Sequence, residues 1–497
     1  MKNKLQVKIL VFLLSIFLGY KILDMYATHK IDTYLKTNFG KTNALEYDEI
    51  EINFLLGNAA LKQCKAIQDS VTFESEKVEI NNFSFYQYFI NNKIKIGSFT
   101  VENSKITGKI IDTKKEEKKS SKSWYEEVNI EEIAFKNLNI NLTKQNNFPL
   151  SIDRIDVNLK DFTLDNPSTA SIPFEYSALK TTIKKFKSQF SKVQAVGFSN
   201  FTFENERIQV DSLEIIPLKS RENYIYHVPY EKDLLTLFVK KITVPSFKIH
   251  NKKRLFFELD TIFIDQGDFN VYGDRVVLEH PHQRKDLYSK SMRNLPFDID
   301  IHKINIQDTQ IVYEELTKKN GTPGLISFNS IHAEINDLTN VERENKFPRT
   351  VIHIDSSFMN TSDLKIDWSF KTDNLNDEFN IRGSLLNVPK ENINSFMRPT
   401  TNVEVEGRIN QLFFNLYGND DVSNGDFEID FDNFKINLLE DGNEKKVLSW
   451  ILNLFIKNSS KNGLIKTEIK DLERDKTRSF WNFFWKNIEK GLKQSLT

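Results

Sequence analysis

The closest pair of histidines in the sequence is His280 and His282, and Glu279 precedes them. Imidazole and carboxylate groups are ligands that zinc prefers, but a protein site needs three or four of them. The other histidines are scattered along the chain, and an HExxH motif is absent. We therefore expect no metal site and no metal cofactor.

Four carboxylates recur at every second residue near the C-terminal end of the chain. They are Asp426, Glu428, Asp430 and Asp432. Paired carboxylates can perform general acid–base catalysis. The residues between them are Phe427, Ile429 and Phe431, so alternation places the carboxylates together on one face of a strand. A solvated outer face of a β-sheet explains this pattern without catalysis.

The single cysteine, Cys64, lies in "AALKQCKAI" without an activating base nearby, and one cysteine excludes an intrachain disulfide. We interpret it as a small buried apolar residue rather than a nucleophile. GxSxG, Walker A and GxGxxG motifs are also absent. The sequence therefore predicts a protein that is not an enzyme and has no cofactor. An unrecognised hydrolase is the least favoured alternative.

The bulk charge argues against a nucleic-acid partner. Lys and Arg together number 68, Asp and Glu 69, and the net charge is -1. A nucleic-acid-binding protein would show a basic excess or a basic stripe. The 497 residues suffice for two or three ordinary domains or for one long repetitive body.

The elements that dominate the chain are strands with an interrupted alternation. In "LPFDIDIHKINIQDTQIVYEE" (residues 295–315), apolar residues alternate, skip two positions and alternate again. Period-two alternation predicts a strand with one apolar face. Because a skip would otherwise exchange the two faces, it requires a bulge or corner. The same step recurs in residues 78–106, 133–164, 242–271 and 328–338.

Strands that bend at similar intervals predict an elongated, curved and mainly antiparallel sheet with a trough-like apolar side. A set of β-sandwich domains with dry cores is the alternative. Asn320-Gly321 is a hairpin turn dipeptide, and 81–82, 91–92 and 97–98 are further short connections. Two polar stretches, 112–123 and 279–294, are expected to be mobile loops. The β body is expected to cover residues 25–440.

The N-terminus carries Lys2, Lys4 and Lys8 before an apolar run. If Lys8 and Lys21 snorkel, residues 7–23 approach the minimum of about 17 residues for a membrane span. We expect residues 1–24 to be an uncleaved transmembrane signal anchor, with the rest of the chain exported. A cleaved signal peptide is the alternative, although a small-x-small cleavage site is missing.

Helical pattern is sparse. Residues 230–241 predict a short helix, and 447–458 are apolar nearly all round. Residues 474–496 predict a basic, aromatic-rich amphipathic helix within a C-terminal segment that covers 441–497. Such a helix either lies in a membrane interface or closes the end of the sheet. The residues expected at the interface are Phe480, Trp481, Phe484, Trp485 and Ile488.

The order of these features resembles the AsmA-like family of Gram-negative envelope proteins, which includes AsmA and TamB. The resemblance rests on the N-terminal anchor, the rung-like segment 295–315 and "NVEVEGRINQLFFNLYGNDDVSNGDFEIDFDNFKINLLE" (402–440), with Gly407 and Gly425. It implies a taco-like β groove that carries phospholipid between the inner and outer membranes without catalytic residues. The chain is shorter than the largest family members, which leaves a complete span between the membranes open.

We therefore expect a single-pass inner-membrane protein whose body lies in the periplasm and binds phospholipids. Outer-membrane or protein partners would be reached through the C-terminus. The alternative is an envelope scaffold with a filled core that assists outer-membrane protein assembly. The residues expected on the groove floor are Ile242, Val244, Phe269, Val271, Phe297, Ile299, Ile301, Ile304 and Ile306.

Overall fold

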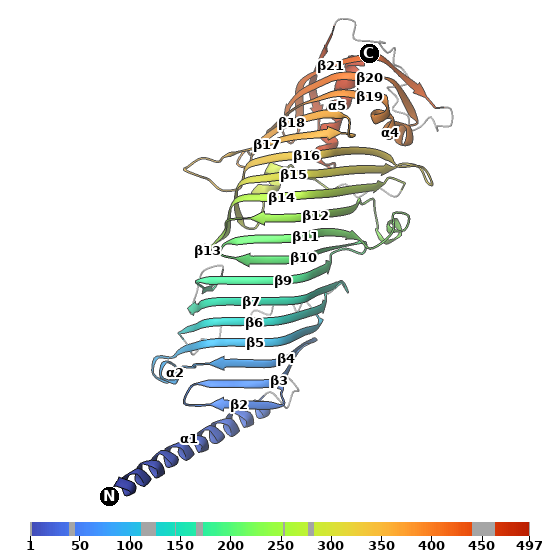
Figure 1. Ribbon diagram of the computed structural model, residues 1–497. Helices are drawn as coiled ribbons and strands as arrows, with labels where there is room; N and C mark the ends of the chain where they lie inside the picture. The colour runs from blue at the N-terminus through green and yellow to red at the C-terminus, as the bar shows by residue number, and fades with distance from the viewer. Residues whose placement is uncertain are drawn as a thin grey trace. The chain divides into compact units, whose positions relative to one another are not determined.

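The computed structural model describes residues 2–38, 45–110, 126–144, 146–165, 172–251, 254–276, 283–439 and 463–496. For residues 2–17, 165 and 438 it describes the backbone but not the side chains. Within these residues the strands form one open, mixed β-sheet of 22 strands (Figure 1). The expectation of a mainly β fold is confirmed. The chain divides into an N-terminal unit (1–189 and 198–205) and a C-terminal unit (190–197 and 206–497).

The N-terminal unit contains two helices, α1 (Lys2–Asn38) and α2 (Phe85–Asn91). Its strands are β1 (Leu45–Glu46), β2 (Glu49–Asn53), β3 (Asn58–Gln68), β4 (Val71–Asn81), β5 (Lys93–Lys109), β6 (Glu127–Thr143), β7 (Pro149–Asp165), β8 (Phe174–Glu175) and β9 (Ala178–Gln189). Strand β10 (Gln194–Glu204) contributes residues to both units.

The C-terminal unit contains the 3-10 helix η2 (Tyr224–His227) and the helices α3 (Tyr288–Arg293), α4 (Lys390–Thr401) and α5 (Phe480–Leu496). Its strands are β11 (Arg207–Pro217), β12 (Leu234–Val244), β13 (Phe247–Asn251), β14 (Leu255–Asp274), β15 (Asp298–Leu316), β16 (Gly324–Thr339), β17 (Arg349–Phe358), β18 (Ser362–Lys371), β19 (Phe379–Pro389), β20 (Val403–Gly418), β21 (Val422–Leu438) and β22 (Ile465–Glu473).

The sheet departs from antiparallel pairing at two junctions, where β5 runs parallel to β6 and β14 runs parallel to β15. A parallel pair needs a long crossover, whereas an antiparallel pair can be joined by a tight turn. The connections at these junctions are residues 110–126 and 275–297. The two polar stretches expected to be loops are therefore the crossovers. Residues 112–123 lie outside the described residues.

The step in the alternation keeps the apolar side chains on one face. Ile299 and Ile301 precede the step at 302–303 and Ile304 follows it, yet all three pack in one hydrophobic cluster. Farther along β15, Asp308 has a positive φ of 48° where the pairing with β16 shifts. A left-handed residue at a bulge accommodates the extra residue of the longer strand. A bulge is thus confirmed at 307–308, whereas the step at 302–303 is passed without a register shift against β14 or β16.

Left-handed residues recur at many of these steps, as the second residue of the skipped pair. They include Gln63, Asn103, Asn137, Asp161, Lys185, Ser212, Gln266, Asp308, Ser330 and Asp337. Asparagine and aspartate tolerate this conformation best because their short side chains can hydrogen-bond locally. In the C-terminal unit Gly407 has a φ of 86°, and a Cβ there would lie 2.3 Å from the Asp432 carbonyl oxygen. The glycine of the β20–β21 hairpin is therefore required by both space and conformation.

The secondary-structure expectations for the regions of β12 and α2 are wrong. Residues 230–241 are not helical, because from Leu234 onward they form β12, in which Leu235 pairs with Val271 and Phe238 is 44% exposed. Tertiary pairing here outweighs a weak helical periodicity. Phe83 and Phe85 do not extend β4, since Ser84 caps helix α2 and its hydroxyl accepts a 3.4 Å hydrogen bond from the Gln87 amide.

The outer parts of the chain are described only in part. Among the described residues, no helix combines the length and apolar character that crossing a bilayer requires. The side chains of residues 2–17 lie outside the description, as do all of residues 447–458. The expected Asn320-Gly321 turn is present in the β15–β16 connection, where Gly321 N–H donates to the Lys318 carbonyl at 3.0 Å. Gly97-Ser98 lies inside β5 instead of connecting two strands.

The left-handed residues make a prediction about stability. Gln63 is exposed and has a φ of 50°. We expect Gln63→Val to lower the free energy of unfolding by about 1–2 kcal/mol, because a β-branched side chain is strained there. Gln63→Gly should cause no loss, since glycine adopts this φ freely. Lys65→Val, on the same strand, is the control. Urea unfolding and amide exchange of β3 measure the effect, and equal losses for all three variants would contradict it.

Candidate functional site

A continuous row of apolar side chains crosses the N-terminal unit. Strand register places its members opposite one another on β3, β4, β5, β6, β7 and β9. They are Ala66, Phe73, Ile106, Ile140, Ile152 and Phe186, called here the N-terminal row. Ile152 is buried and the other five are half-buried. The row therefore keeps part of its apolar surface accessible.

A second row crosses ten strands of the C-terminal unit, from β11 to β21. Its members, called the C-terminal row, are Val210, Ile242, Ile264, Ile306, Ala333, Ile354, Ile366, Gly383, Phe414 and Phe427. The first four are half-buried, whereas Phe414 and Phe427 are 6% and 0% exposed. Ile354 and Ile366 are also half-buried, but they pack against the buried cluster that contains Phe414 and Phe427. The half-buried part of the row outside that cluster therefore lies on β11 to β15.

The residues expected on the groove floor all belong to the C-terminal unit, and the strands bring most of them together. Ile242 and Ile306 are members of the C-terminal row. Ile264 of β14 lies between them and pairs with both. Ile299 and Ile304 pack with the buried Val244 and Ile301 around Leu259. Val244 and Ile301 are buried, and the other four expected floor residues in this group are half-buried.

Of the remaining three expected floor residues, two lie apart from that cluster, and Phe297 borders it through Phe257. Phe269 and Val271 are half-buried near the end of β14, where they pair with Leu237 and Leu235 of β12. Phe297 precedes β15, and its ring centroid lies 5.3 Å from that of Phe257.

The opposite face of each unit is charged. In the N-terminal unit the Lys136 ammonium lies 2.8 Å from the Glu102 carboxylate, on strands whose other face carries the N-terminal row. In the C-terminal unit the four carboxylates of β21 alternate with Phe427, Ile429 and Phe431, which are 0%, 1% and 0% exposed. Glu428 pairs with Lys466 at 2.8 Å. The carboxylates are therefore on a solvated outer face, as expected from the alternation.

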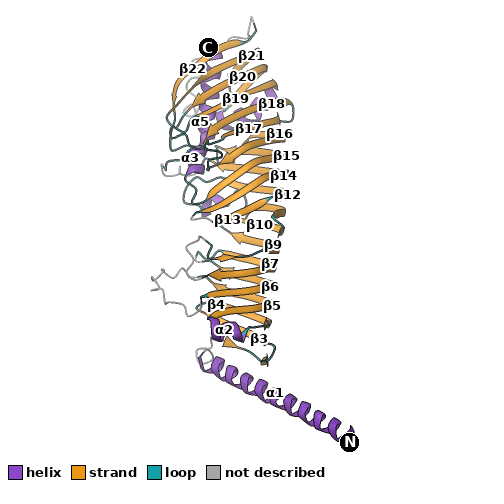
Figure 2. Cartoon of the chain, turned by 90° about the vertical axis from the view of Figure 1, so that its left-hand side faces the viewer, coloured by secondary structure: helices purple, strands orange, loops and turns teal. Residues whose placement is uncertain are grey.

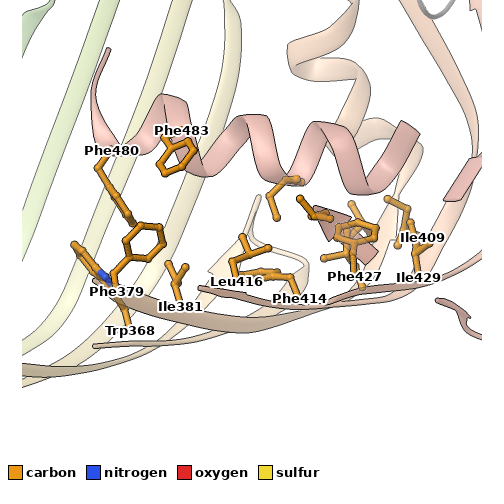
Figure 3. Close-up of a cluster of buried hydrophobic side chains, with 14 of the residues drawn as sticks. Trp368, Phe379, Ile381, Ile409, Phe414, Leu416, Phe427, Ile429, Phe480 and Phe483 are labelled. Carbon is orange, nitrogen blue, oxygen red and sulfur yellow. The ribbon is translucent and has the colours of Figure 1, made fainter. Parts of the chain in front are cut away.

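The end of the C-terminal row is covered by α5 (Figure 2). Phe480 stacks on Trp368 with ring centroids 4.8 Å apart. The ring centroids of Phe484 and Phe414 lie 5.4 Å apart. A Cβ at Gly491 would lie 2.5 Å from the ring of Phe427, so the helix and β21 approach closely. Figure 3 shows side chains of α5 facing those of the strands across this cluster. Here the apolar face is filled by the chain itself.

Of the five residues expected at a membrane interface, three take part in this packing. Phe480 is 4% exposed and Ile488 is 9% exposed, both within the hydrophobic cluster. Phe484 packs against the same cluster and is half-buried. Only Trp481 and Trp485, at 48% and 45%, are exposed. The predicted amphipathic helix exists, and its apolar face closes one end of the sheet.

The second crossover is also tied to this end of the C-terminal unit. Residues 283–294 were expected to be a mobile loop, but they contain α3 and the buried Leu287, which is 3% exposed. Tyr288 accepts a 3.0 Å hydrogen bond from the indole N–H of Trp481 on α5. The Ser289 hydroxyl donates to Asp377 at 2.8 Å. Glu279, His280 and His282 lie outside the described residues.

A buried ion pair fixes the turn before β21 to the segment that leads into α5. The Arg474 side chain is fully buried and its guanidinium pairs with Asp420, which also pairs with Arg284 of the crossover. Burial lowers the pKa of Arg474, and the Asp420 carboxylate opposes this by favouring the charged form. Removing one partner of a buried pair leaves an uncompensated charge, so the pair holds three segments in register.

A second polar network, partly buried, lies at the ends of β12, β14 and β15. The Arg275 guanidinium donates to the Tyr313 hydroxyl at 2.9 Å and pairs with Asp233 at 3.0 Å. Burial raises the pKa of Tyr313 and raises that of Tyr224 to about 12. The Tyr224 hydroxyl accepts a 3.0 Å hydrogen bond from the backbone N–H of Asp274. Both phenols stay neutral at ordinary pH, and the network has a structural role.

Metal ligands and the single cysteine were the remaining candidates for reactive chemistry. No group of three or more His, Cys, Asp or Glu side chains among them could hold a metal ion. Cys64 is a free, buried cysteine with 5% exposure, and its burial raises the pKa of the thiol. The interpretation of Cys64 as a small buried apolar residue is confirmed. What the site offers is apolar surface.

No family model matches this sequence, and a search of curated proteins also finds no match.

Sequence reasoning missed two parts of the site. The N-terminal row was visible in the alternation of residues 94–106, 133–142 and 150–164, but it was not joined into a row because register between strands cannot be read from one strand. The packing of Trp368 against α5 had no sequence signal beyond the aromatic character of both. The periodic stripe of α5 indicated a buried face without naming its partner.

The approach of α5 to β21 can be tested at Gly491. We expect Gly491→Leu to destabilise the docked helix by about 1–3 kcal/mol, because the added side chain meets the Phe427 ring. Trypsin cleavage at Lys486 and Lys490 should then become faster. Gln494→Leu, three residues on and exposed, is the matched control. Unchanged cleavage in Gly491→Leu would show that α5 does not pack as described.

Cys64 gives a second test. Because the thiol is buried and its pKa is raised, less thiolate forms below that pKa than in an exposed cysteine. We expect iodoacetamide at pH 8 to modify the native chain at least roughly tenfold more slowly than the urea-unfolded chain. The native rate should also keep rising with pH beyond the range where an exposed thiol levels off. Mass spectrometry measures the rates, and equal rates in both states would contradict the burial.

Proposed function

We propose that this chain is a membrane-anchored lipid-binding protein of the AsmA-like type that holds phospholipid acyl chains on its apolar sheet face. The observation that carries the proposal is the pair of uninterrupted apolar rows. Most members of these rows are only half-buried. A β-sheet with a completed core buries such side chains. Half-buried isoleucine and phenylalanine side chains leave apolar surface for a ligand that is itself apolar.

The energetics suit a hydrocarbon tail. Each methylene removed from water contributes about 0.8 kcal/mol, so an acyl chain in water is strongly disfavoured. The members of each row lie side by side on successive strands, about 4.8 Å apart. They therefore provide apolar contacts at regular intervals along the length of an acyl tail. The charged headgroup would remain in solvent. Movement along such a face needs no specific polar contact.

The packing of α5 sets where a tail could lie in the C-terminal unit. Phe414, Phe427 and the α5 aromatics already fill the apolar face at β19 to β22. The accessible stretch is β11 to β15, which includes Ile242, Ile264 and Ile306. In this proposal the N-terminal segment anchors the chain in the inner membrane and the body lies in the periplasm, where it transfers phospholipid toward the outer membrane.

The second candidate is a non-enzymatic envelope scaffold that assists outer-membrane protein assembly. The filled cluster beneath α5 favours it, because that part of the apolar face serves stability alone. The two candidates differ in bound lipid. Native mass spectrometry of the detergent-free protein should show co-purified phospholipid for a lipid carrier, and its consistent absence would favour the scaffold.

The lipid-binding proposal is tested at Ile306, a half-buried member of the C-terminal row that belongs to none of the buried clusters. A carboxylate there would remove the contact with about two methylenes, about 1.6 kcal/mol, or roughly tenfold in lipid occupancy. We expect Ile306→Glu to reduce photo-crosslinking to phospholipid by that factor while circular dichroism stays unchanged.

The control is Gln307→Glu, an exposed neighbour that introduces the same group. It should crosslink lipid as the unaltered chain does. Undiminished crosslinking in Ile306→Glu, with a normal fold, would remove the support for this face as the lipid-binding surface.

A further inference from the structure

An apolar surface patch lies at one end of the N-terminal unit, away from the N-terminal row. It consists of Leu55 and Leu56 in the β2–β3 turn and Tyr86, Phe89 and Ile90 on α2, and is called here the α2 patch. Their exposed fractions are 68%, 60%, 65%, 70% and 65%. Scattered single apolar residues are normal on protein surfaces, but a gathered group indicates an interaction site.

The patch is built by aromatic packing beneath it. The rings of Phe54 and Phe85 lie 4.4 Å apart, and Phe83 lies 5.1 Å from Phe85 and 5.6 Å from Tyr88. These contacts join the β2–β3 turn to α2. The Phe83 amide donates to the Gly57 carbonyl at 2.9 Å, which fixes the same junction.

Helix α2 is apolar on two sides, which is unusual for a surface helix. Phe85 and Tyr88 face the aromatic packing, while Tyr86, Phe89 and Ile90 are spaced so that they share the outward side. A surface helix of a water-soluble body normally carries charged residues on its outer side. Residues 52–61 and 80–92 contain no Asp, Glu, Lys or Arg, in a chain that is 28% charged. The surface is uncharged as well as apolar.

A hydrogen bond connects this end of the unit to α1. The Phe54 amide donates to the Asp24 carboxylate at 2.8 Å, and Asp24 itself is 8% exposed. Asp24 immediately follows residues 7–23, the apolar run assigned to the membrane anchor. On α1, Ile22, Leu23 and Met25 beside Asp24 are 65%, 50% and 72% exposed. Asp24 therefore marks the point where an inserted α1 would leave the hydrocarbon.

We propose that the α2 patch docks on the surface of the bilayer that holds α1. The proposal rests on the membrane anchor of the proposed function. If residues 7–23 lie in the hydrocarbon, the hydrogen bond from Phe54 to Asp24 places the β2–β3 turn at the level of the lipid headgroups. Tyrosine and other aromatic side chains favour that level, where an apolar body and a polar tip are both accommodated. Leu55, Leu56, Phe89 and Ile90 then enter the outer edge of the acyl region.

Docking would also orient the β body. A single helix leaves the body free to tilt, whereas a second contact at α2 fixes the β2 and β3 end of the N-terminal unit against the lipid. The N-terminal row begins on β3 and β4, which are the first long strands after α1, so the row begins on the long strands nearest to the anchor in the sheet. The patch thus adds a bilayer-contacting surface to a proposed lipid carrier.

The test uses the full-length chain reconstituted in vesicles of phosphatidylethanolamine and phosphatidylglycerol. In a Cys64→Ala background, single cysteines replace Phe89, Asp69 or Phe12 and carry an environment-sensitive NBD dye. Asp69, in the β3–β4 turn at the other end of β3, is the exposed control, and Phe12 reports on the anchor. Doxyl-labelled lipid quenches the dye only where it touches the bilayer.

We expect blue-shifted emission and doxyl quenching at positions 89 and 12 but not at position 69. Quenching at 12 without quenching at 89 overturns the docking and leaves the anchor standing. An unquenched dye at 12 overturns the anchor itself. Shielding of position 89 from aqueous iodide without doxyl quenching would indicate a second protein copy on the patch, which also overturns the docking.

A second experiment introduces charge into the patch and reads the effect at another patch residue, Ile90. Leu56→Asp combined with Tyr86→Asp should lower doxyl quenching at an NBD-labelled Ile90→Cys several-fold, because two carboxylates oppose entry into the lipid. Both replaced side chains are more than half exposed, so the fold should persist in circular dichroism. Quenching at Phe12→Cys should be unchanged, and undiminished quenching at Ile90→Cys would overturn the docking.

Discussion

The structure depends on keeping one face of each strand apolar across steps that would otherwise exchange its two faces. One unpaired extra residue turns every following side chain to the other side of a sheet. In this chain a left-handed residue stands at many of the steps, as Asn137 does in β6 and Asp308 in β15. The strand bends there and its apolar face continues. Both rows exist because neighbouring strands place their bends in matching register.

The C-terminal unit uses the same face in two ways. Under α5 it becomes a filled core, in which Phe427 is fully buried, Gly491 allows the helix to come close, and the Arg474–Asp420 pair ties the connecting segments together. On β11 to β15 the members of the C-terminal row are only half-buried. Helix α5 therefore stabilises the end of the sheet and limits where a ligand could lie.

Lipid contact would occur on two different surfaces in the proposed function. The rows would hold hydrocarbon one molecule at a time, and the α2 patch would contact an intact bilayer. The chemistry of the two surfaces differs in keeping with those roles. The rows are flanked by charged strand faces, as at Glu102 and Lys136, whereas the segments around the α2 patch carry no charge.

The fold class and the position of many bends could be predicted from the sequence because both follow from periodicity within one strand. Alternation gave the apolar side of "DIDIHKINI", and the two-residue skip required a bulge. The parallel pairs could not be predicted, since a polar stretch such as 112–123 fits a loop as well as a crossover. Leu234 to Phe238 was misread as helical because five residues fit both periods and only pairing with β14 decides between them.

The sequence by itself thus determined a β protein with one apolar and one charged strand face, a buried thiol at Cys64 and an amphipathic C-terminal helix. These are local properties, fixed by the order of apolar and polar residues. Tertiary structure alone decided which side chains form rows, that Phe480 and Ile488 face the sheet, and that Phe85 begins a helix. Register and helix docking join residues far apart in the chain, and their free energies depend on partners that no single segment specifies.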